Sequence, residues 1–339
     1  MFRDVRYRGM AGWLAQESEM RLGRLRCIQS GGLLFVLFFI PSAIFLQPAR
    51  AGSIELPAEV RQAMDIMYDG NPDAAIPIAR RLQQEQPDHP LGYLLEAEAL
   101  WWKRYCASCE IRYGMADAWK RGKEPGDDAY LAVSAREIDA AEAMLAKSET
   151  AEWHVYAGLG YALKARVYGL RGENHNVARA AVKGRAEMLR ALELDPQQAD
   201  ATAVLGVYNY YVECLSPIVK LLRIFTGIPG GDKQEGIKQL ELGANQGVLM
   251  AVDSRFILAS LLRQYDQKYE QALTAAQPLA ERYPHHPLFL LLAGNLNAEL
   301  GRSGKASEYF HAALQAAIPD PVCSARIHDM ATSFLSSTH

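Results

Sequence analysis

Short turn sequences rich in proline, glycine, asparagine and aspartate divide much of the chain into helical stretches. They lie at residues 69–72, 86–90, 194–196 and 283–287. The stretches between them are rich in Ala, Leu, Glu, Gln and Arg and carry apolar residues at three- and four-residue spacing, the period of a helix packed on one side. Proline directly after such a stretch marks the end of a helix. Strand patterns are nearly absent, so the sequence predicts an all-α fold built from helix pairs.

Small and aromatic residues recur at fixed distances within these pairs. Residues 287–319 carry, in order, Gly294, Gly301, Ala306, Phe310, Ala313 and Pro319. This segment resembles a tetratricopeptide repeat, although Leu290 and Asn297 stand where that repeat has Trp and Tyr. Residues 256–284 and 63–87 give further copies, and a fourth copy ends at Pro196. The resemblance predicts a tetratricopeptide-like α-solenoid of about five or six helix pairs.

The middle of the chain departs from this regular spacing. Gly158 and Gly184 take the two small-residue positions of a repeat but are 26 residues apart, where the repeat has about 12. We therefore expect an insertion near residues 164–180. A second insertion is expected near residues 212–231. It holds an apolar segment that either packs across neighbouring pairs or forms a lid or partner-binding helix.

The second insertion lies in a segment with a more specific resemblance. Residues 205–240 match a pattern of Gly206, Tyr208, Asn209, Ser216, Pro217, Leu221, Leu222, Gly227, Gly231, Asp232, Gly236 and Leu240. This pattern is similar to the signature of the eukaryotic tetratricopeptide-repeat-39 and inclusion-body-clearance family, with Lys233 in place of the family's Arg. The resemblance implies a non-enzymatic helical-repeat protein. From the residues alone, Asp232 and Glu235 predict a capped helix start.

The N-terminal residues have the pattern of an export signal. Three arginines precede the uncharged apolar run 33–46, and Ala49 and Ala51 follow it at the positions of a cleavage site. This pattern predicts a signal peptide over residues 1–51. A translation start at Met20 would give a simpler version of the same signal. The mature domain would then be 52–339, exported and periplasmic. The alternative is an uncleaved membrane anchor over residues 31–49, which would be the chain's contact with the membrane.

Charge and motifs exclude several classes of function. The chain has 36 Lys and Arg against 39 Asp and Glu, a net charge of −3. A nucleic-acid-binding protein needs a basic excess to neutralise phosphates, so no nucleic-acid partner is expected. The sequence has no HExxH motif, nucleophile elbow or Walker sequence. We expect no catalytic residues, no metal and no cofactor. The alternative is an enzyme in which carboxylates from distant helices converge.

Cys106 and Cys109 form a Cys-x-x-Cys pair. A haem attachment site needs His at position 110, which is Glu, and a thioredoxin-like site needs a βαβ context. Four cysteines in an exported domain, the others being Cys214 and Cys323, favour disulfides. The sequence predicts a Cys106–Cys109 bridge. Buried thiols, and a metal or redox site, are the alternatives.

Aromatic residues concentrate between residues 93 and 211. Adjacent rings on a helix point about 100° apart, so one core-facing stripe does not accommodate both. We therefore expect some rings, with two nearby arginines, to line a concave partner-binding groove over residues 93–240. The alternative is that the rings fill space between long helices. The predicted partner-binding residues are Trp101, Trp102, Tyr105, Trp119, Trp153, Tyr156, Arg166, Arg171, Tyr208, Tyr210 and Tyr211.

Together these features predict an exported scaffold that binds a protein or peptide partner in the bacterial cell envelope. Two alternatives remain. One is an enzyme or small-molecule binder with a pocket under residues 212–231. The other is a structural subunit of a membrane-associated complex, held at the membrane by residues 31–49.

Overall fold

A computed structural model describes residues 54–108, 122–214 and 228–337. They belong to one compact unit, Gln47–His339. The predicted signal segment, and the membrane anchor that is its alternative, lie outside the described residues.

The described residues form helices joined by short turns, with no strand among them. The helices are α1 (Ala58–Tyr68), α2 (Pro72–Glu85), α3 (Leu91–Ser108), α5 (Asp127–Lys147), α6 (Ala151–Leu170), α7 (Asn174–Leu194), α8 (Ala199–Cys214), α10 (Lys233–Gln246), α11 (Ala251–Gln264), α12 (Tyr269–Arg282), α13 (Pro287–Glu299), α14 (Ser303–Gln315) and α15 (Pro321–Ser337). The predicted all-α fold is confirmed.

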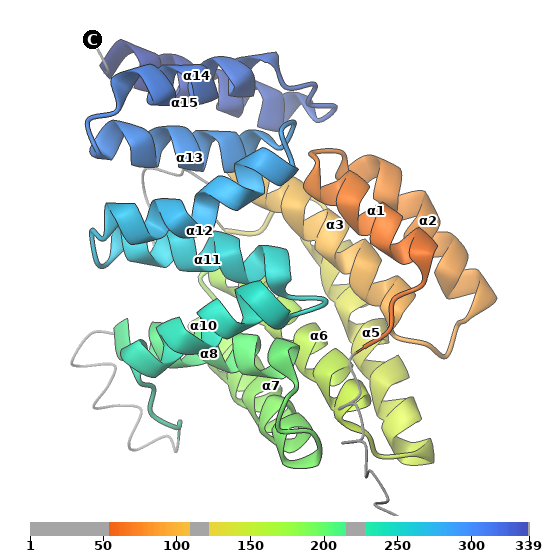
Figure 1. Ribbon diagram of the computed structural model, residues 1–339. Coiled ribbons are helices and arrows are strands. Elements are labelled where there is room, and N and C mark those ends of the chain that lie inside the picture. The colour runs from red at the N-terminus through yellow and green to blue at the C-terminus, as the bar shows by residue number, and fades with distance from the viewer. Residues whose placement is uncertain (1–53, 109–121, 215–227, 338–339) are drawn as a thin grey trace, which may run out of the picture. The chain divides into compact units, whose positions relative to one another are not determined.

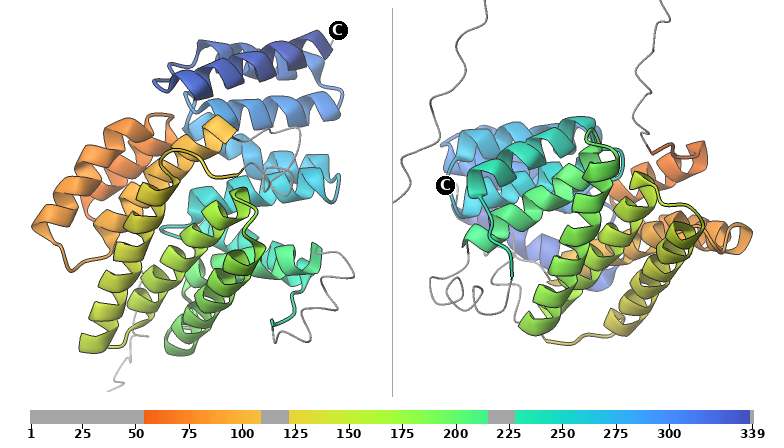
Figure 2. Two further views of the ribbon diagram at one scale, coloured as in Figure 1. Left: turned by 180° about the vertical axis from the view of Figure 1, so that it is seen from behind. Right: turned by 90° about the horizontal axis from the view of Figure 1, so that it is seen from below.

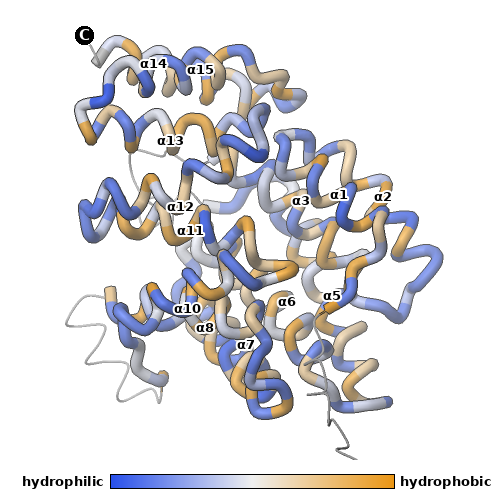
Figure 3. The backbone as a smooth tube through the Cα atoms, in the orientation of Figure 1, coloured by the Kyte–Doolittle hydropathy of each residue, from blue (hydrophilic) through white to orange (hydrophobic). Residues whose placement is uncertain are grey.

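Each described helix packs against the next one along the chain, so the helices stack in sequence order from α1 to α15 (Figures 1 and 2). They form six consecutive pairs, α1/α2, α3/α5, α6/α7, α8/α10, α11/α12 and α13/α14, followed by α15. The stack is an α-solenoid, as predicted. Figure 3 shows apolar and polar residues alternating along most helices, as expected for helices that bury one side.

The four predicted turns separate helices where the sequence placed them. Residues 69–72, for example, lie between α1 and α2, and residues 283–287 lie between α12 and α13. Local chemistry starts the helices: Asn71 Oδ1 accepts from the Ala74 N–H at 3.2 Å. Asp232 Oδ1 accepts from the Glu235 N–H at 3.0 Å, which confirms the predicted start of α10.

The extra residues between Gly158 and Gly184 do not form a separate insertion. They lengthen α6 to 20 residues and α7 to 21, and a short turn at 171–173 joins the two helices. The two glycines still face each other, because a Cβ on Gly158 would lie 3.2 Å from the Gly184 carbonyl oxygen. The extra residues expected near residues 164–180 thus lie within two long helices in close contact. Most of the second insertion, residues 215–227, lies outside the described residues.

The first helix also contacts the last third of the chain. Asp65 accepts hydrogen bonds from Arg282 and from the Tyr283 hydroxyl, both at 3.0 Å. Asp69 accepts from the backbone N–H of His285 at 3.2 Å. These contacts join the end of α1 and the α1–α2 turn to the end of α12 and the turn that follows it, so the solenoid closes on itself along this side.

A disulfide forms a second link between the early and the late helices. Cys106, in α3, is bonded to Cys323, in α15, and their Cα atoms are 5.2 Å apart. The predicted Cys106–Cys109 bridge is therefore wrong, since Cys106 has a different partner; Cys109 lies outside the described residues. Sequence spacing favoured the local pair, whereas the folding of α15 onto α3 brings together two cysteines 217 positions apart.

Breaking this disulfide has a predictable effect. Cys323→Ser is expected to lower the free energy of unfolding by about 2–4 kcal/mol, because the bond constrains the unfolded chain over a long loop. Urea denaturation followed by circular dichroism measures the change. Cys214→Ser is the control, since Cys214 is outside the bond. An equal loss in the two variants, or no loss in Cys323→Ser, would contradict the prediction.

Candidate functional site

Helix α3 is buried on nearly all sides. Of its 18 residues, the buried ones include both Trp101 and Trp102. Trp102 packs its ring edge-on against Tyr68 of α1, Phe256 of α11 and Phe289 of α13. Trp101 turns the other way, and Arg166 of α6 lies over its ring, 5.4 Å from the centroid. Adjacent aromatic residues are accommodated because α3 has packing partners on opposite sides.

Six of the predicted groove residues are core residues. Trp101, Trp102, Tyr105, Tyr156, Tyr208 and Tyr210 are all less than a tenth exposed. The prediction that these rings line an open groove is thus corrected, and they fill the space between helices instead. Trp153 and Tyr211 are half-buried, and Trp119 lies outside the described residues.

The two arginines of the predicted groove have different surroundings. Arg171 lies at the α6–α7 turn, with its Nη1 3.7 Å from the Asp128 carboxylate at the start of α5 and its Nε 2.5 Å from Glu173. Arg166 lies deep in the molecule. The structure therefore brings Trp101 and Arg166 together but leaves Arg171 in a separate, peripheral ion-pair cluster.

Arg166 is the centre of a buried network of charged and polar groups. Its Nη1 donates to both carboxylate oxygens of Glu98, in α3, at 3.0 Å, and its Nη2 donates to Asp253 Oδ1, in α11, at 3.1 Å. The Tyr68 hydroxyl, in α1, donates to Asp253 Oδ2 at 2.9 Å. The network, defined here as Tyr68, Glu98, Arg166 and Asp253, links four helices that belong to four different pairs.

Burial shapes the protonation of this network. It raises the pKa of Glu98 to about 8, against the opposing effect of Arg166. Burial also acts to lower the pKa of Arg166, but the charges of Glu98 and Asp253 outweigh it and raise that pKa. The guanidinium therefore stays charged, and a carboxyl group is the part of the network that can take up or release a proton.

Glu137, in α5, is a second buried carboxyl group close to the network. Its side chain is fully buried, and neither carboxyl oxygen makes a hydrogen bond with a described residue. Burial, followed by the charge of Glu98, raises its pKa well above the ordinary value. Burial therefore favours the protonated, uncharged form of the Glu137 carboxyl group.

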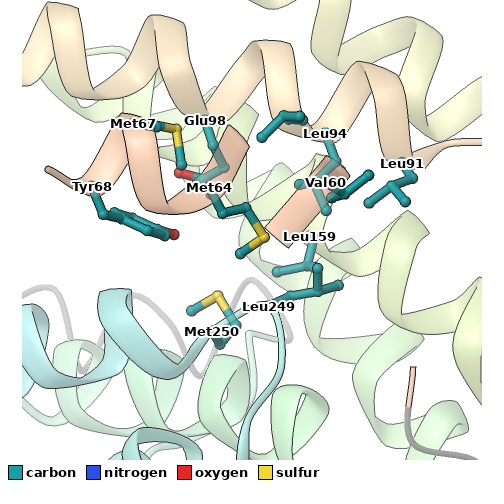
Figure 4. Close-up of a pocket in the computed structure, with 11 residues that line it drawn as sticks. Val60, Met64, Met67, Tyr68, Leu91, Leu94, Glu98, Leu159, Leu249 and Met250 are labelled. Atoms are coloured by element: carbon teal, nitrogen blue, oxygen red, sulfur yellow. The ribbon is translucent and has the colours of Figure 1, made fainter. Parts of the chain in front are cut away.

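The cavity beside this network is too small for an organic ligand. Its volume is about 20 Å³, which suffices for roughly one water molecule. Figure 4 shows Met64, Met67 and Met250 pointing into it beside the carboxylate of Glu98. Ligand sites for small molecules are typically hundreds of cubic ångströms. This part of the interior therefore holds buried charges but no space for a substrate.

A larger hollow lies on the outer surface at the α7–α8 turn. It has a volume of about 510 Å³ and is lined by the turn at 195–200 and by Leu242 and Val248 from the α10 side. Leu242, which lines the hollow, is 36% exposed, and Leu194, directly before the lining turn, is 40% exposed. We call the hollow together with Leu194 and Leu242 the α7/α10 hollow.

The floor of this hollow is held in place by Asp200. Its Oδ1 accepts backbone hydrogen bonds from Val248, Leu249 and Met250, at 2.9, 3.0 and 2.8 Å, just before α11 begins. Asp200 Oδ2 and Gln198 Nε2 are shielded from solvent. Polar recognition at this surface would consequently use the exposed groups of the turn.

Sequence reasoning missed the Glu98–Arg166–Asp253 network. The signal that pointed to it was Glu96 and Glu98 within the otherwise apolar residues 91–102. A charged residue at a core position needs a buried partner. Its identity was not readable, because Arg166 and Asp253 come from helices more than 60 residues away.

No three His, Cys, Asp or Glu side chains of the described residues come together as metal ligands. None of the described helices combines the length and the apolar character needed to cross a membrane. Compared with known proteins, the chain matches no family model and no curated protein.

Proposed function

We propose that this chain is an exported helical-repeat scaffold of the tetratricopeptide class, which binds a protein or peptide partner in the bacterial cell envelope and has no catalytic activity of its own. The observation that supports it most directly is the α-solenoid with a filled interior. The cavity beside the buried charged network, about 20 Å³, has no room for a substrate, whereas the surface carries a hollow of about 510 Å³ with the exposed Leu242 in its lining.

The proposed location has independent support. The Cys106–Cys323 disulfide joins two buried cysteines, and structural disulfides persist mainly in exported proteins and are rare in the cytosol. This agrees with the export signal expected over residues 1–51. The disulfide also favours a closed solenoid, whose partner binds on the outside rather than in a concave groove.

The α7/α10 hollow is the proposed partner surface. Leu194 and Leu242 come from the α7 and α10 sides of it and would anchor an apolar side chain, while the polar turn at 195–200 offers hydrogen bonds to a peptide backbone. An exposed apolar side chain in the lining of a hollow, as Leu242 is here, suits the burial of an apolar anchor from a partner.

Site-specific crosslinking tests this proposal. A photo-crosslinking amino acid at position 194 or 242 of the full chain, in its native envelope, is expected to give the same discrete adduct. Position 322 is the matched control, because Val322 is an exposed apolar residue of α15. Leu242→Asp is expected to reduce the adduct from position 194 roughly tenfold, as the loss of one apolar anchor does. Equal adducts at 322, or none at 194 and 242, would contradict the proposal.

A further inference from the structure

The Tyr68–Glu98–Arg166–Asp253 network joins parts of the solenoid that do not follow one another along the chain. Tyr68 belongs to the first pair, Glu98 to the second, Arg166 to the third and Asp253 to the fifth. All four side chains are largely buried. Consecutive helices of a solenoid pack through apolar faces. A charged cluster that links non-consecutive helices therefore contributes separately to the stability of the closed solenoid.

The charges of this network do not balance when both carboxyl groups are ionised. One guanidinium then faces two carboxylates, which leaves an excess negative charge in a desolvated site. The ionisable groups that face Glu98 are Tyr68 on α1, Glu137 on α5, Arg166 on α6 and Asp253 on α11, with Tyr130 of α5 nearby. Arg166 is the one cation among them. Like charges at this proximity favour uptake of a proton by one carboxyl group.

Hydrogen bonding indicates which carboxyl group takes it. Both oxygens of Asp253 have separate donors, Arg166 Nη2 and the Tyr68 hydroxyl. The two oxygens of Glu98 share a single donor, Arg166 Nη1. Glu98 can therefore hold a proton on one oxygen and keep its hydrogen bond to Arg166 through the other.

We propose that this network is a proton-linked clamp. With one proton bound to Glu98, it holds α1 and α3 against α6 and α11. Release of that proton at alkaline pH leaves the excess negative charge buried and loosens the contact, which makes the closure of the solenoid dependent on pH.

The direction of the pH effect follows from linkage. In the unfolded chain Glu98 has its ordinary pKa of 4.5, and in the folded chain the pKa is about 8. Between these values the folded state binds the proton more strongly, so stability falls as pH rises through this window. The equilibrium constant for unfolding increases by up to about tenfold per pH unit from this group.

His286 acts in the opposite direction and at lower pH. It is buried against Phe289, and burial lowers its pKa from 6.5 to about 3. The unfolded chain therefore takes up the proton first on acidification, and stability falls as pH drops below 6.5. At higher pH His286 is neutral in both the folded and the unfolded chain, so its contribution to the free energy of unfolding is constant. The change in that free energy at alkaline pH therefore reports the carboxyl groups.

The test compares urea denaturation of the full chain at about pH 6.5 and about pH 9, where the linkage of the carboxyl groups dominates. Glu98→Gln and Asp253→Asn each remove the excess negative charge and are expected to abolish most of the alkaline increase in the unfolding constant. Tyr68→Phe is the matched control: it removes a hydrogen bond from the same network without changing its charge, and it is expected to keep the pH dependence of the parent.

Hydrogen exchange of the parent locates the effect. After correction for the intrinsic pH dependence of exchange, amides in α1 and α3 are expected to lose protection at alkaline pH before those of α14. The clamp is overturned if Glu98→Gln and Asp253→Asn keep the pH dependence of the parent. It is also overturned if both variants fail to fold at pH 6.5, because the proposal has Glu98 already protonated, and therefore uncharged, at that pH. Equal loss of protection across all helices also overturns it.

Discussion

Arg166→Met is expected to lower the free energy of unfolding by about 3–5 kcal/mol, the typical cost of removing one partner from a buried ion pair. At neutral pH the change leaves the Asp253 carboxylate, beside the protonated Glu98, buried without its counter-charge at the point where α3, α6 and α11 meet. Methionine keeps most of the volume of the arginine stem, so little of the loss would come from a cavity. Urea denaturation followed by far-ultraviolet circular dichroism measures it.

Arg81→Met is the matched control for this prediction. Arg81 also contacts two carboxylates, Glu59 and Glu85, but its side chain is 53% exposed. Exposed ion pairs contribute about 0–1 kcal/mol, so this variant should resemble the parent. A second comparison is Arg166→Met combined with Asp253→Asn, which should recover part of the loss because fewer unpaired charges remain. Equal losses in Arg166→Met and Arg81→Met would show that the network is not the source of stability.

Trp102→Ala is expected to lower the free energy of unfolding by about 3–5 kcal/mol, the usual cost of removing a large buried ring. The ring centroid of Trp102 lies 6.0 Å from that of Tyr68, 5.2 Å from Phe256 and 5.5 Å from Phe289. Its loss would leave a cavity between the first helices and the last third of the chain. Hydrogen exchange should therefore show weaker protection in α13 as well as in α3.

Trp153→Ala is the control for ring removal. Trp153 is half-buried near the start of α6 and stacks on Tyr156 at a centroid distance of 5.9 Å. Its removal exposes an edge of the core without creating an enclosed cavity, so a smaller loss is expected. The prediction fails if Trp153→Ala is the more damaging of the two, or if Trp102→Ala leaves the protection of α13 unchanged.

Much of the fold followed from local sequence. The proline- and glycine-containing turns defined where helices stop, because proline cannot continue a helix and short polar residues cap the next one. Glycines of the repeat pattern lie at helix contacts: a Cβ on Gly294 would clash with the Phe310 ring, and Gly206 and Gly236 lie too close to neighbouring backbone for side chains. These features repeat within about 30 residues, which is why a single sequence displays them.

Local sequence did not reveal the surroundings of the aromatic and cysteine side chains. The aromatic residues between 93 and 211 were consistent with either a groove or a core. Position along a helix does not say how many neighbours surround it, and α3 has neighbours on nearly all sides. The cysteines show the same effect. The spacing of Cys106 and Cys109 suggested a local disulfide, but α15 packs against α3 and Cys106 is bonded to Cys323.

The helices, their order and the small residues at their contacts can be read from the sequence, because they depend on neighbours within one or two turns of chain. The closure of the solenoid, the aromatic core and the meeting of Arg166 with Glu98 and Asp253 become visible in the folded chain alone. Those contacts join residues far apart along the chain. They follow from the summed geometry of the helix pairs, which no single segment of sequence encodes.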